Sequence, residues 1–311
     1  MKKVLITDAV HSVLTDGLET AGYLCDYEPD ISSPEVYERI GTYHGIIINS
    51  KIRVDKPFID RATRLEFVAR LGSGREVVDI PYAESRGIRV YFSPEGNSNA
   101  VGEHALGMLL AFANNLVRGD QEVRQKIWRR EQNRGFELKG KTIGIIGFGH
   151  TGPAFARKLK ALDMNILVYD KYRKDLKKEH GHIHETGLSE ICREAEIISF
   201  HLPLSPETIH YCNAKFINDC RQRPLLINTS RGSIVDTAAL LEGLLRNQIR
   251  GACLDVFENE NPVTFSEEEN KLYEQLYNLN NVILSPHVAG WTMESKYMLG
   301  KVLLDKILSR L

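Results

Sequence analysis

Three side chains that can bind an anion or move a proton lie in similar places in the second half of the chain. Arg231, Glu260 and His287 each come shortly after an apolar run typical of a β-strand. These runs span residues 225–228, 252–255 and 282–285. Ligands of open parallel sheets bind outside the carboxyl ends of the strands, so we expect the three side chains to meet at one sheet edge.

This set suits hydride transfer to the carbonyl carbon of a 2-keto acid. The planar guanidinium of Arg231 can bind the carboxylate or the carbonyl oxygen. A protonated His287 can give its proton as the hydride arrives and take it back in the reverse direction. Glu260 as an anion beside it would stabilise the imidazolium. The alternative is that these residues form a surface ion pair and a core histidine with no catalytic role. That explanation suits any one of the residues, but it suits the combination of all three less well.

A glycine-rich segment could hold the hydride carrier. Residues 141–153 read KTIGIIGFGHTGP, an apolar strand followed by Gly-x-Gly-x-x-Gly and the start of a helix. Gly147 allows a tight turn, Gly149 leaves room for a pyrophosphate, and Gly152 lets the helix pack close to the strand. The backbone N–H groups of the helix start, around His150 and Thr151, would then face the anion.

Asp170 indicates which dinucleotide is bound. It ends the next strand, 18 residues after Gly152, where an acidic residue receives the ribose hydroxyls of NAD and repels the extra phosphate of NADP. The basic run at residues 171–178 leaves an NADP pocket as an alternative. We favour a solvated helix face with Asp175 and Glu179 as partners, and therefore NAD.

Alternating histidines at His180, His182 and His184 raise the question of a transition metal. An exposed loop and a short strand explain them as well, and we predict no metal site.

Apolar strand runs alternate with helical patterns, which predicts an α/β fold with parallel sheets covered by helices. The first section has strand runs at 4–7, 23–27, 45–48, 67–71 and 89–91, and the second at 142–146, 165–169, 196–200, 225–228, 252–255 and 282–285. A long apolar helix is expected at 98–117 and a C-terminal helix at 292–311. The first of these, too apolar for a surface helix, should be buried in a core or an interface.

Composition limits the class of protein. The chain has 311 residues, a net charge of -1 and 42% hydrophobic residues, so nothing suggests nucleic acid or a membrane as a partner. Its five dispersed cysteines suggest reduced thiols in a cytoplasmic protein. We expect a homodimer, with residues 101–117 and the arm carrying Trp128 as the interface.

Together these motifs resemble the D-isomer-specific 2-hydroxyacid dehydrogenase family over nearly the whole chain. They are the loop Gly147–Gly152, His201-Leu202-Pro203 through Thr208, Asn228–Gly232, Asp255 through Glu260, and Pro286–Gly290. The resemblance implies that Arg231 is the catalytic arginine and His287 the general acid/base paired with Glu260. It places Asp255 near the nicotinamide carboxamide. The other cofactor contacts expected from these motifs are His150, Thr151, His201, Leu202, Pro203, Thr208, Thr229, Ser230 and Gly290.

The resemblance also implies two doubly wound parallel-sheet domains, Rossmann-like and flavodoxin-like, with a cleft between them. Residues 1–98 and 287–311 would bind the substrate, and residues 99–286 would bind NAD. The loop at 71–74 matches a turn that holds the substrate carboxylate, which makes Ser73 and Gly74 expected contacts; a plain turn is the alternative.

The substrate is left open among 3-phosphoglycerate-like acids, hydroxypyruvate and glyoxylate. The chain looks closest to the phosphoglycerate dehydrogenase branch, which commonly has an arginine where this chain has Asn49. Arg70 resembles a position at which that branch places a cation, so both residues are expected near the substrate. A non-enzymatic NAD-sensing protein of the corepressor type is the second hypothesis, and measurable turnover would separate the two.

Overall fold

The computed structural model describes residues 1–309 of the chain. It divides into two compact units, Met1–Ser98 with Trp291–Leu311, and Asn99–Gly290. The first boundary falls inside helix α5 (Pro94–Ala113). The second boundary lies after Gly290, whereas the sequence analysis expects it before His287. The backbone N–H groups of Val288 and Ala289 bond to Asp255, which keeps this segment with the second unit. The last two positions of the expected C-terminal helix lie outside the described residues.

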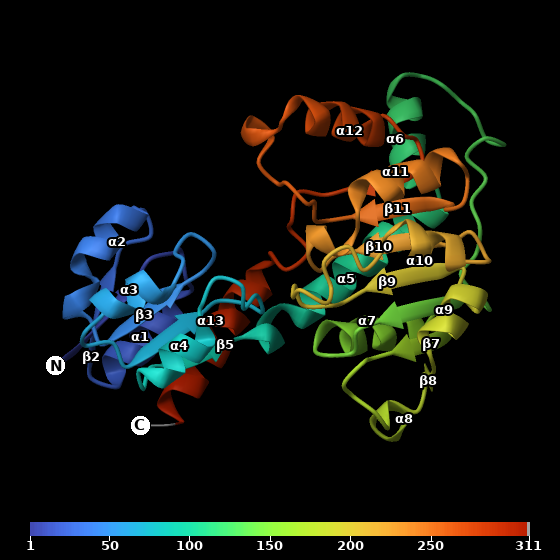
Figure 1. Ribbon diagram of the computed structural model, residues 1–311. Coiled ribbons are helices and arrows are strands. Elements are labelled where there is room, and N and C mark those ends of the chain that lie inside the picture. The colour runs from blue at the N-terminus through green and yellow to red at the C-terminus, as the bar shows by residue number, and fades with distance from the viewer. Residues whose placement is uncertain (310–311) are drawn as a thin grey trace. The chain divides into compact units, whose positions relative to one another are not determined.

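The first unit contains a five-stranded parallel sheet in the order β2-β1-β3-β4-β5 (Figure 1). Its strands are β1 (Lys2–Ile6), β2 (Tyr23–Tyr27), β3 (Gly45–Ile48), β4 (Phe67–Arg70) and β5 (Arg89–Phe92). Its helices are α1 (Ser12–Thr20), α2 (Ser33–Arg39), α3 (Lys56–Arg61), α4 (Ile80–Ser85) and α13 (Met293–Leu308), with the 3-10 helix η1 (Ile40–Thr42). Asp55 caps α3 by accepting the Phe58 N–H at 3.1 Å.

The second unit contains a seven-stranded parallel sheet in the order β12-β11-β10-β9-β6-β7-β8. Its strands are β6 (Thr142–Ile146), β7 (Asn165–Tyr169), β8 (His184–Glu185), β9 (Ile197–Phe200), β10 (Leu225–Asn228), β11 (Gly251–Leu254) and β12 (Val282–Leu284). Its further helices are α6 (Leu116–Arg124), α7 (Thr151–Lys160), α8 (Leu176–Glu179), α9 (Leu188–Glu194), α10 (Ala214–Asp219), α11 (Thr237–Leu245) and α12 (Glu267–Tyr277), with the 3-10 helices η2 (Gly232–Ile234) and η3 (Pro262–Thr264). The predicted α/β class is confirmed. The strand order reverses at β6, which is where ligands of such sheets bind.

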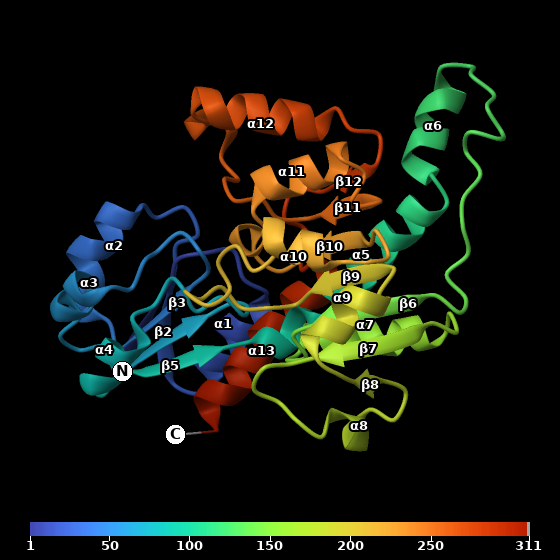
Figure 2. The same cartoon turned by 45° about the vertical axis from the view of Figure 1, so that its right-hand side comes forward.

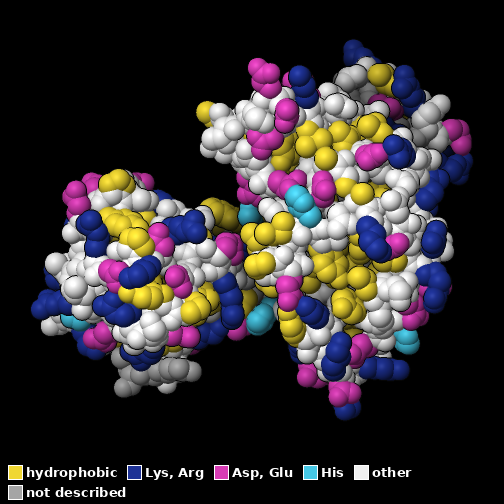
Figure 3. Space-filling model, in the orientation of Figure 1, with side chains coloured by type: hydrophobic (Ala, Val, Ile, Leu, Met, Phe, Trp, Pro, Cys, Tyr) yellow, Lys and Arg dark blue, Asp and Glu magenta, His cyan; other side chains and the backbone are white. Residues whose placement is uncertain are grey.

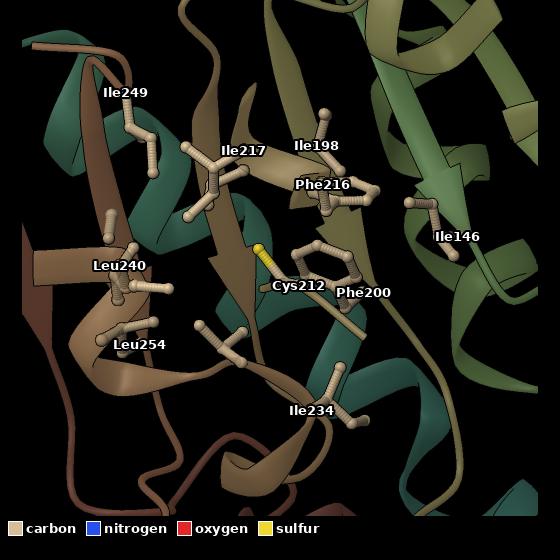
Figure 4. Packing of buried hydrophobic residues seen from close by; sticks show 14 of the residues in the cluster. Ile146, Ile198, Phe200, Cys212, Phe216, Ile217, Ile234, Leu240, Ile249 and Leu254 are labelled. Atoms are coloured by element: carbon tan, nitrogen blue, oxygen red, sulfur yellow. The ribbon is translucent and has the colours of Figure 1, made fainter. Parts of the chain in front are cut away.

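Both faces of each sheet are buried, which explains the continuous apolar strand runs. In the second unit, α5 and α7 cover one face and α9 to α12 cover the other. Successive residues of β9 alternate between the two clusters, so Ile197 faces one side and Ile198 the other. Figure 4 shows Phe200, Phe216 and Cys212 side by side in the second cluster, and the two rings lie 5.7 Å apart. Cys212 is thus a core residue.

The long apolar helix differs from the expected one. It begins at Pro94, a residue well suited to a first helical turn, and ends at Ala113. Asn115 then adopts a left-handed conformation with φ of 51°, which breaks the helix before α6. Figures 1 and 2 show α6 and the segment after it extending away from the sheet of their own unit.

Charged side chains of both signs are interspersed over the face drawn in Figure 3. This pattern agrees with the net charge of -1 and offers no broad basic surface there for nucleic acid. None of the described helices combines the length and the apolar composition that crossing a bilayer requires.

Candidate active site

The predicted catalytic residues follow three neighbouring strands of the second unit. Strands β10, β11 and β12 end level, because Asn228 pairs with Leu254 and Leu254 pairs with Leu284. The loops after them carry Arg231, Glu260 and His287. The shared strand direction therefore delivers all three residues to one sheet edge, as the sequence predicts.

His287 and Glu260 form a hydrogen-bonded pair, with Nδ1 of the ring 2.7 Å from Oε2 of the carboxylate. A carboxylate only accepts hydrogen bonds, so Nδ1 carries the hydrogen and donates it. That assignment leaves Nε2 as the ring atom able to exchange a proton with a ligand. Glu260 also accepts the backbone N–H of Phe257 at 3.3 Å, which fixes the orientation of the carboxylate.

The charge of Glu260 is stabilised by its surroundings. Burial raises the pKa of this carboxyl, but the hydrogen bond from His287 and the positive charges of His287 and Arg231 outweigh burial and lower the pKa below its ordinary value of 4.5. Glu260 is therefore an anion at neutral pH. The positive charge of Arg231 is the smallest of the contributions that lower this pKa, and it comes from the loop after the neighbouring strand β10.

Asn228 shapes the loop that carries Arg231. Its buried side-chain amide donates to the Arg231 carbonyl at 2.9 Å. Its carbonyl oxygen accepts the backbone N–H and the hydroxyl of Ser230 at 3.1 and 2.7 Å. Ser230, an expected cofactor contact, thus uses its hydroxyl within the loop, which resembles an Asx turn.

Asp255 holds the His287 segment in place. Its side chain is only 1% exposed, and Oδ1 accepts the Ser285 hydroxyl and the Val288 N–H while Oδ2 accepts the Ala289 N–H. The family resemblance implies that this carboxylate lies near the nicotinamide carboxamide, and that remains a prediction. In the described structure it accepts two backbone N–H groups and the Ser285 hydroxyl, which tie the segment carrying His287 to the end of β11.

His287 itself has strained backbone geometry. Its φ of 54° lies in the left-handed region, which is uncommon for a residue with a side chain. Its N–H bonds to the carbonyls of Asp255 and Ser285 at 2.7 and 3.1 Å. Such a conformation persists only where neighbouring contacts enforce it, and the Asp255 hydrogen bonds supply that enforcement.

The glycine-rich loop has the geometry of a phosphate-binding turn. Gly147 has φ of 91°, and a Cβ there would lie 2.4 Å from the His201 carbonyl oxygen. A Cβ on Gly152 would lie 2.5 Å from the Gly147 carbonyl oxygen, so the helix start packs tightly on the turn. At Gly149 a Cβ would meet no described atom within 4 Å. The space over Gly149 is therefore open, where the sequence predicts a pyrophosphate.

Asp170 organises the same turn. Oδ2 accepts the Phe148 N–H at 2.7 Å, and Oδ1 accepts the N–H groups of Tyr172 and Arg173 at 2.9 Å each. Burial raises the pKa of Asp170, but these three hydrogen bonds outweigh it and lower the pKa. A carboxylate has about four acceptor positions, so one remains on Oδ2 for a ribose hydroxyl.

The basic run after Asp170 is largely paired, as expected. Lys178 lies 3.3 Å from Asp175 and Arg173 lies 3.3 Å from Glu179. Arg173 also donates to the Phe148 carbonyl at 2.5 Å, a contact with the glycine-rich loop that the sequence did not suggest.

The three alternating histidines do not lie together in one cluster of metal-ligating side chains. Across residues 1–309, no three His, Cys, Asp or Glu side chains lie close enough together to hold a metal ion. His180 packs its ring against Phe148, with centroids 5.2 Å apart, and His184 begins the two-residue strand β8. The short strand favoured by the sequence is observed, but the loop is less exposed than expected, because His180 and His182 are partly buried.

The stretch after β9 lies beside the glycine-rich loop. His201 is buried; its Nε2 contacts the Ser199 hydroxyl at 2.9 Å, while Nδ1 has no hydrogen-bond partner among the described residues. The Thr208 hydroxyl donates to the Pro203 carbonyl at 2.7 Å and so closes the loop. Leu202 also lies against the turn, 3.0 Å from where a Gly147 Cβ would be.

The expected substrate residues lie in the first unit, after the adjacent strands β3 and β4. Arg70 donates from Nε to the Asn49 carbonyl at 3.4 Å. Gly72, with φ of 116°, turns the chain toward Ser73 and Gly74, and its N–H bonds to the buried Ser93 hydroxyl at 3.0 Å. The sequence analysis missed Ser93, although a polar residue directly after β5 was the available signal.

Asp8 was also missed, although it too is a polar residue shortly after a strand, here β1. Its carboxylate accepts the Asn49 N–H at 2.9 Å. The structure thus places the Asp8 carboxylate beside Asn49, where the family resemblance led us to look for an arginine.

The buried imidazole of His201 should make folding acid-sensitive. Burial lowers its pKa from 6.5 to about 4, so between these values the unfolded chain binds a proton that the folded chain does not. Stability is therefore lost as the pH falls, by about 2 kcal/mol at pH 5. Chemical unfolding of His201→Gln at pH 7.5 and 5 should show a pH effect smaller by about that amount. An equal pH effect in the wild type and the variant would contradict the assignment; His184→Gln, at an exposed position, is the control.

A family model and several known proteins are similar to this chain. The model of the D-isomer specific 2-hydroxyacid dehydrogenase NAD binding domain matches residues 106–289. A D-3-phosphoglycerate dehydrogenase of Archaeoglobus fulgidus is 31% identical over 307 residues, 99% of this chain and 57% of that protein. A glyoxylate reductase of Pyrococcus furiosus is 32% identical over 318 residues, 99% of this chain and 91% of that protein.

The solved structures agree. The crystal structure of a D-lactate dehydrogenase from Aquifex aeolicus, complexed with NAD and lactic acid, matches with a TM-score of 0.83 and 26% identity, covering 99% of this chain and 95% of that one. The chain spans little more than half the length of the phosphoglycerate dehydrogenases, but nearly the full length of the glyoxylate reductase and of the D-lactate dehydrogenase. The chain belongs to the D-isomer specific 2-hydroxyacid dehydrogenase family.

Proposed function

We propose that the chain is an NAD-dependent D-2-hydroxyacid dehydrogenase that reduces a small 2-keto acid at C2 and catalyses the reverse oxidation. The observation that carries the proposal is the 2.7 Å pair between His287 and Glu260, with Arg231 in electrostatic reach. The pair provides a proton donor with an anionic partner, and Arg231 provides a cation for the substrate.

The residues of the second unit fit NAD as the bound dinucleotide. The space over Gly149 is open, and Asp170 keeps one acceptor position. The buried Thr229 hydroxyl has no hydrogen-bond partner within the described part of the chain, so it is available to a ligand. NAD would supply or accept the hydride, and residues 147–152 would hold its pyrophosphate.

In the reduction, His287 would donate the proton from Nε2 to the carbonyl oxygen of the keto acid while the hydride reaches C2. Glu260 would stabilise the imidazolium before transfer and hold the ring through Nδ1 afterwards. Arg231 would bind the substrate carboxylate or polarise its carbonyl. The product is the 2-hydroxy acid, and the oxidation runs through the same groups in the opposite order.

We propose a short, unphosphorylated keto acid, glyoxylate or hydroxypyruvate, as the preferred substrate. The Asp8 carboxylate beside Asn49 disfavours a second anionic group at that sheet edge. Arg70, whose Nε donates to the Asn49 carbonyl, would contribute positive charge toward the substrate carboxylate. Ser73 and Gly74 would add backbone N–H groups to the same anion.

The first test is NADH oxidation with glyoxylate, hydroxypyruvate, 3-phosphohydroxypyruvate and pyruvate. We expect turnover of the first two to exceed that of the phosphorylated acid. His287→Ala should lose at least about a hundredfold in kcat because the general acid is gone, and Glu260→Gln should lose less because an acceptor for Nδ1 remains.

The same assay includes a control variant, and one of its outcomes would contradict the proposal. His184→Ala changes an exposed histidine of the same unit and should match the wild type. If the wild type binds NADH and turns over none of these acids, the chain is instead an NAD-sensing binding protein.

Asp170 should determine the preference for NADH. Asp170→Ser removes the charge that repels a 2′-phosphate, so the ratio of kcat/KM for NADH to that for NADPH should fall at least about tenfold. Asp175→Ser makes the same charge change nearby and should leave the ratio unaltered. An unchanged ratio in Asp170→Ser would show that the basic run, not Asp170, governs the choice.

We also propose a homodimer formed through the arm of the second unit. Leu116, Val117, Val123 and Trp128 are exposed there, Trp128 by 76%. Exposed apolar groups gathered on one segment are typical of an interface. Light scattering at micromolar concentration should give twice the chain mass, and Trp128→Glu should shift the protein toward the monomer; a wild-type monomer would refute the proposal.

A further inference from the structure

Two residues outside the site described so far complete the support of His287. His104, on α5, places Nε2 2.9 Å from the Ser285 hydroxyl. That hydroxyl donates to Oδ1 of Asp255 at 2.5 Å. The sequence analysis assigned no role to His104 or to Ser285.

The donor and the acceptor in each of these hydrogen bonds can be assigned from Asp255. Asp255 as a carboxylate can only accept, so Ser285 must use its one hydroxyl hydrogen on Asp255. The Ser285 oxygen is then an acceptor toward His104, and Nε2 must carry a hydrogen. Met108 Sδ, 3.9 Å from the hydroxyl, is a weaker alternative acceptor than the carboxylate at 2.5 Å.

His104 also faces the buried charge directly. Its Nε2 lies 3.5 Å from Oδ1 of Asp255, whose side chain is 1% exposed. A buried carboxylate is costly unless donors surround it. The imidazole N–H therefore supports the carboxylate through Ser285, with its nitrogen 3.5 Å from the charged oxygen.

The place of His104 on its helix is unusual for a surface residue. Val101, Ala105 and Met108 on the same face of α5 are buried, and the His104 side chain is 26% exposed. The His104 ring therefore lies among buried apolar side chains of α5 and makes a polar contact with Ser285, the residue that follows β12.

We propose that His104 is a positioning residue for the reaction. Its Nε2–H, through Ser285, keeps Asp255 oriented toward the N–H groups of Val288 and Ala289. Those hydrogen bonds keep His287 in its left-handed conformation and paired with Glu260. The proposal rests on the proposed catalytic role of His287.

The test compares His104→Gln with His104→Leu. A glutamine can place an amide N–H near the position of Nε2, whereas leucine has similar bulk and no donor. We expect His104→Leu to lower kcat between about tenfold and a hundredfold with KM for NADH unchanged, because misplacement of the acid acts on the chemical step. His104→Gln should recover most of the loss, and Ser285→Ala should resemble His104→Leu.

A second measurement is independent of turnover. The ring Cε1–H resonance of His287, in protein labelled with ¹³C-histidine and identified by its loss in His287→Gln, reports the loop directly. It should shift or broaden in His104→Leu and stay in place in His104→Gln. If the wild type reduces no keto acid, the proposed function fails, but this resonance still tests the geometry.

Two outcomes would overturn the proposal. One is an unchanged His287 resonance and unchanged kcat in His104→Leu. The other is an equal loss in the glutamine and leucine variants, which would mean that the packing of the histidine matters and its N–H does not.

Discussion

The buried carboxylate of Asp255 is the constraint on which the candidate active site depends. It accepts hydrogen bonds from Ser285, Val288 and Ala289, which fasten the segment carrying His287 to the end of β11. Hydrogen bonds to a charged group contribute about 1.5–3 kcal/mol each, enough to offset a strained backbone conformation of about 1–3 kcal/mol. The left-handed backbone at His287 then directs its ring to Glu260. This carboxylate thus connects the order of the sheet to the geometry of the proton donor.

Two other carboxylates at strand ends also accept a backbone N–H of a neighbouring loop. Asp8 after β1 accepts the Asn49 N–H, and Asp170 after β7 accepts the Phe148 N–H. In each case a carboxylate at the end of one strand fixes the loop that follows the adjacent strand of the same sheet. Parallel strands end at a common edge, so a short acidic side chain can reach the next loop without any long connection. Three of the loops expected to contact substrate or dinucleotide are ordered in this way.

The sequence predicted most of the fold because apolar strand runs bounded by turns are a strong local signal. It also placed His287 and Glu260 at one sheet edge through the common strand direction, and the family resemblance implied that the two are paired. It did not predict the break at Asn115, because a single left-handed asparagine leaves the apolar pattern intact. The second unit boundary and the enclosed position of Asp255 depend on backbone hydrogen bonds to Val288 and Ala289, which no side-chain pattern encodes. His104 was missed because its partners are distant in sequence.

Amide hydrogen exchange at Val288 and Ala289 tests the role of Asp255 most directly. In Asp255→Asn only one side-chain oxygen remains for three donors, so at least one loop N–H loses its acceptor. We expect both amides to be strongly protected in the wild type and at least one to exchange much faster in the variant, while the amides of β11 keep their protection. Equal protection in the two proteins would show that the segment carrying His287 is held by other contacts and that Asp255 does not position it.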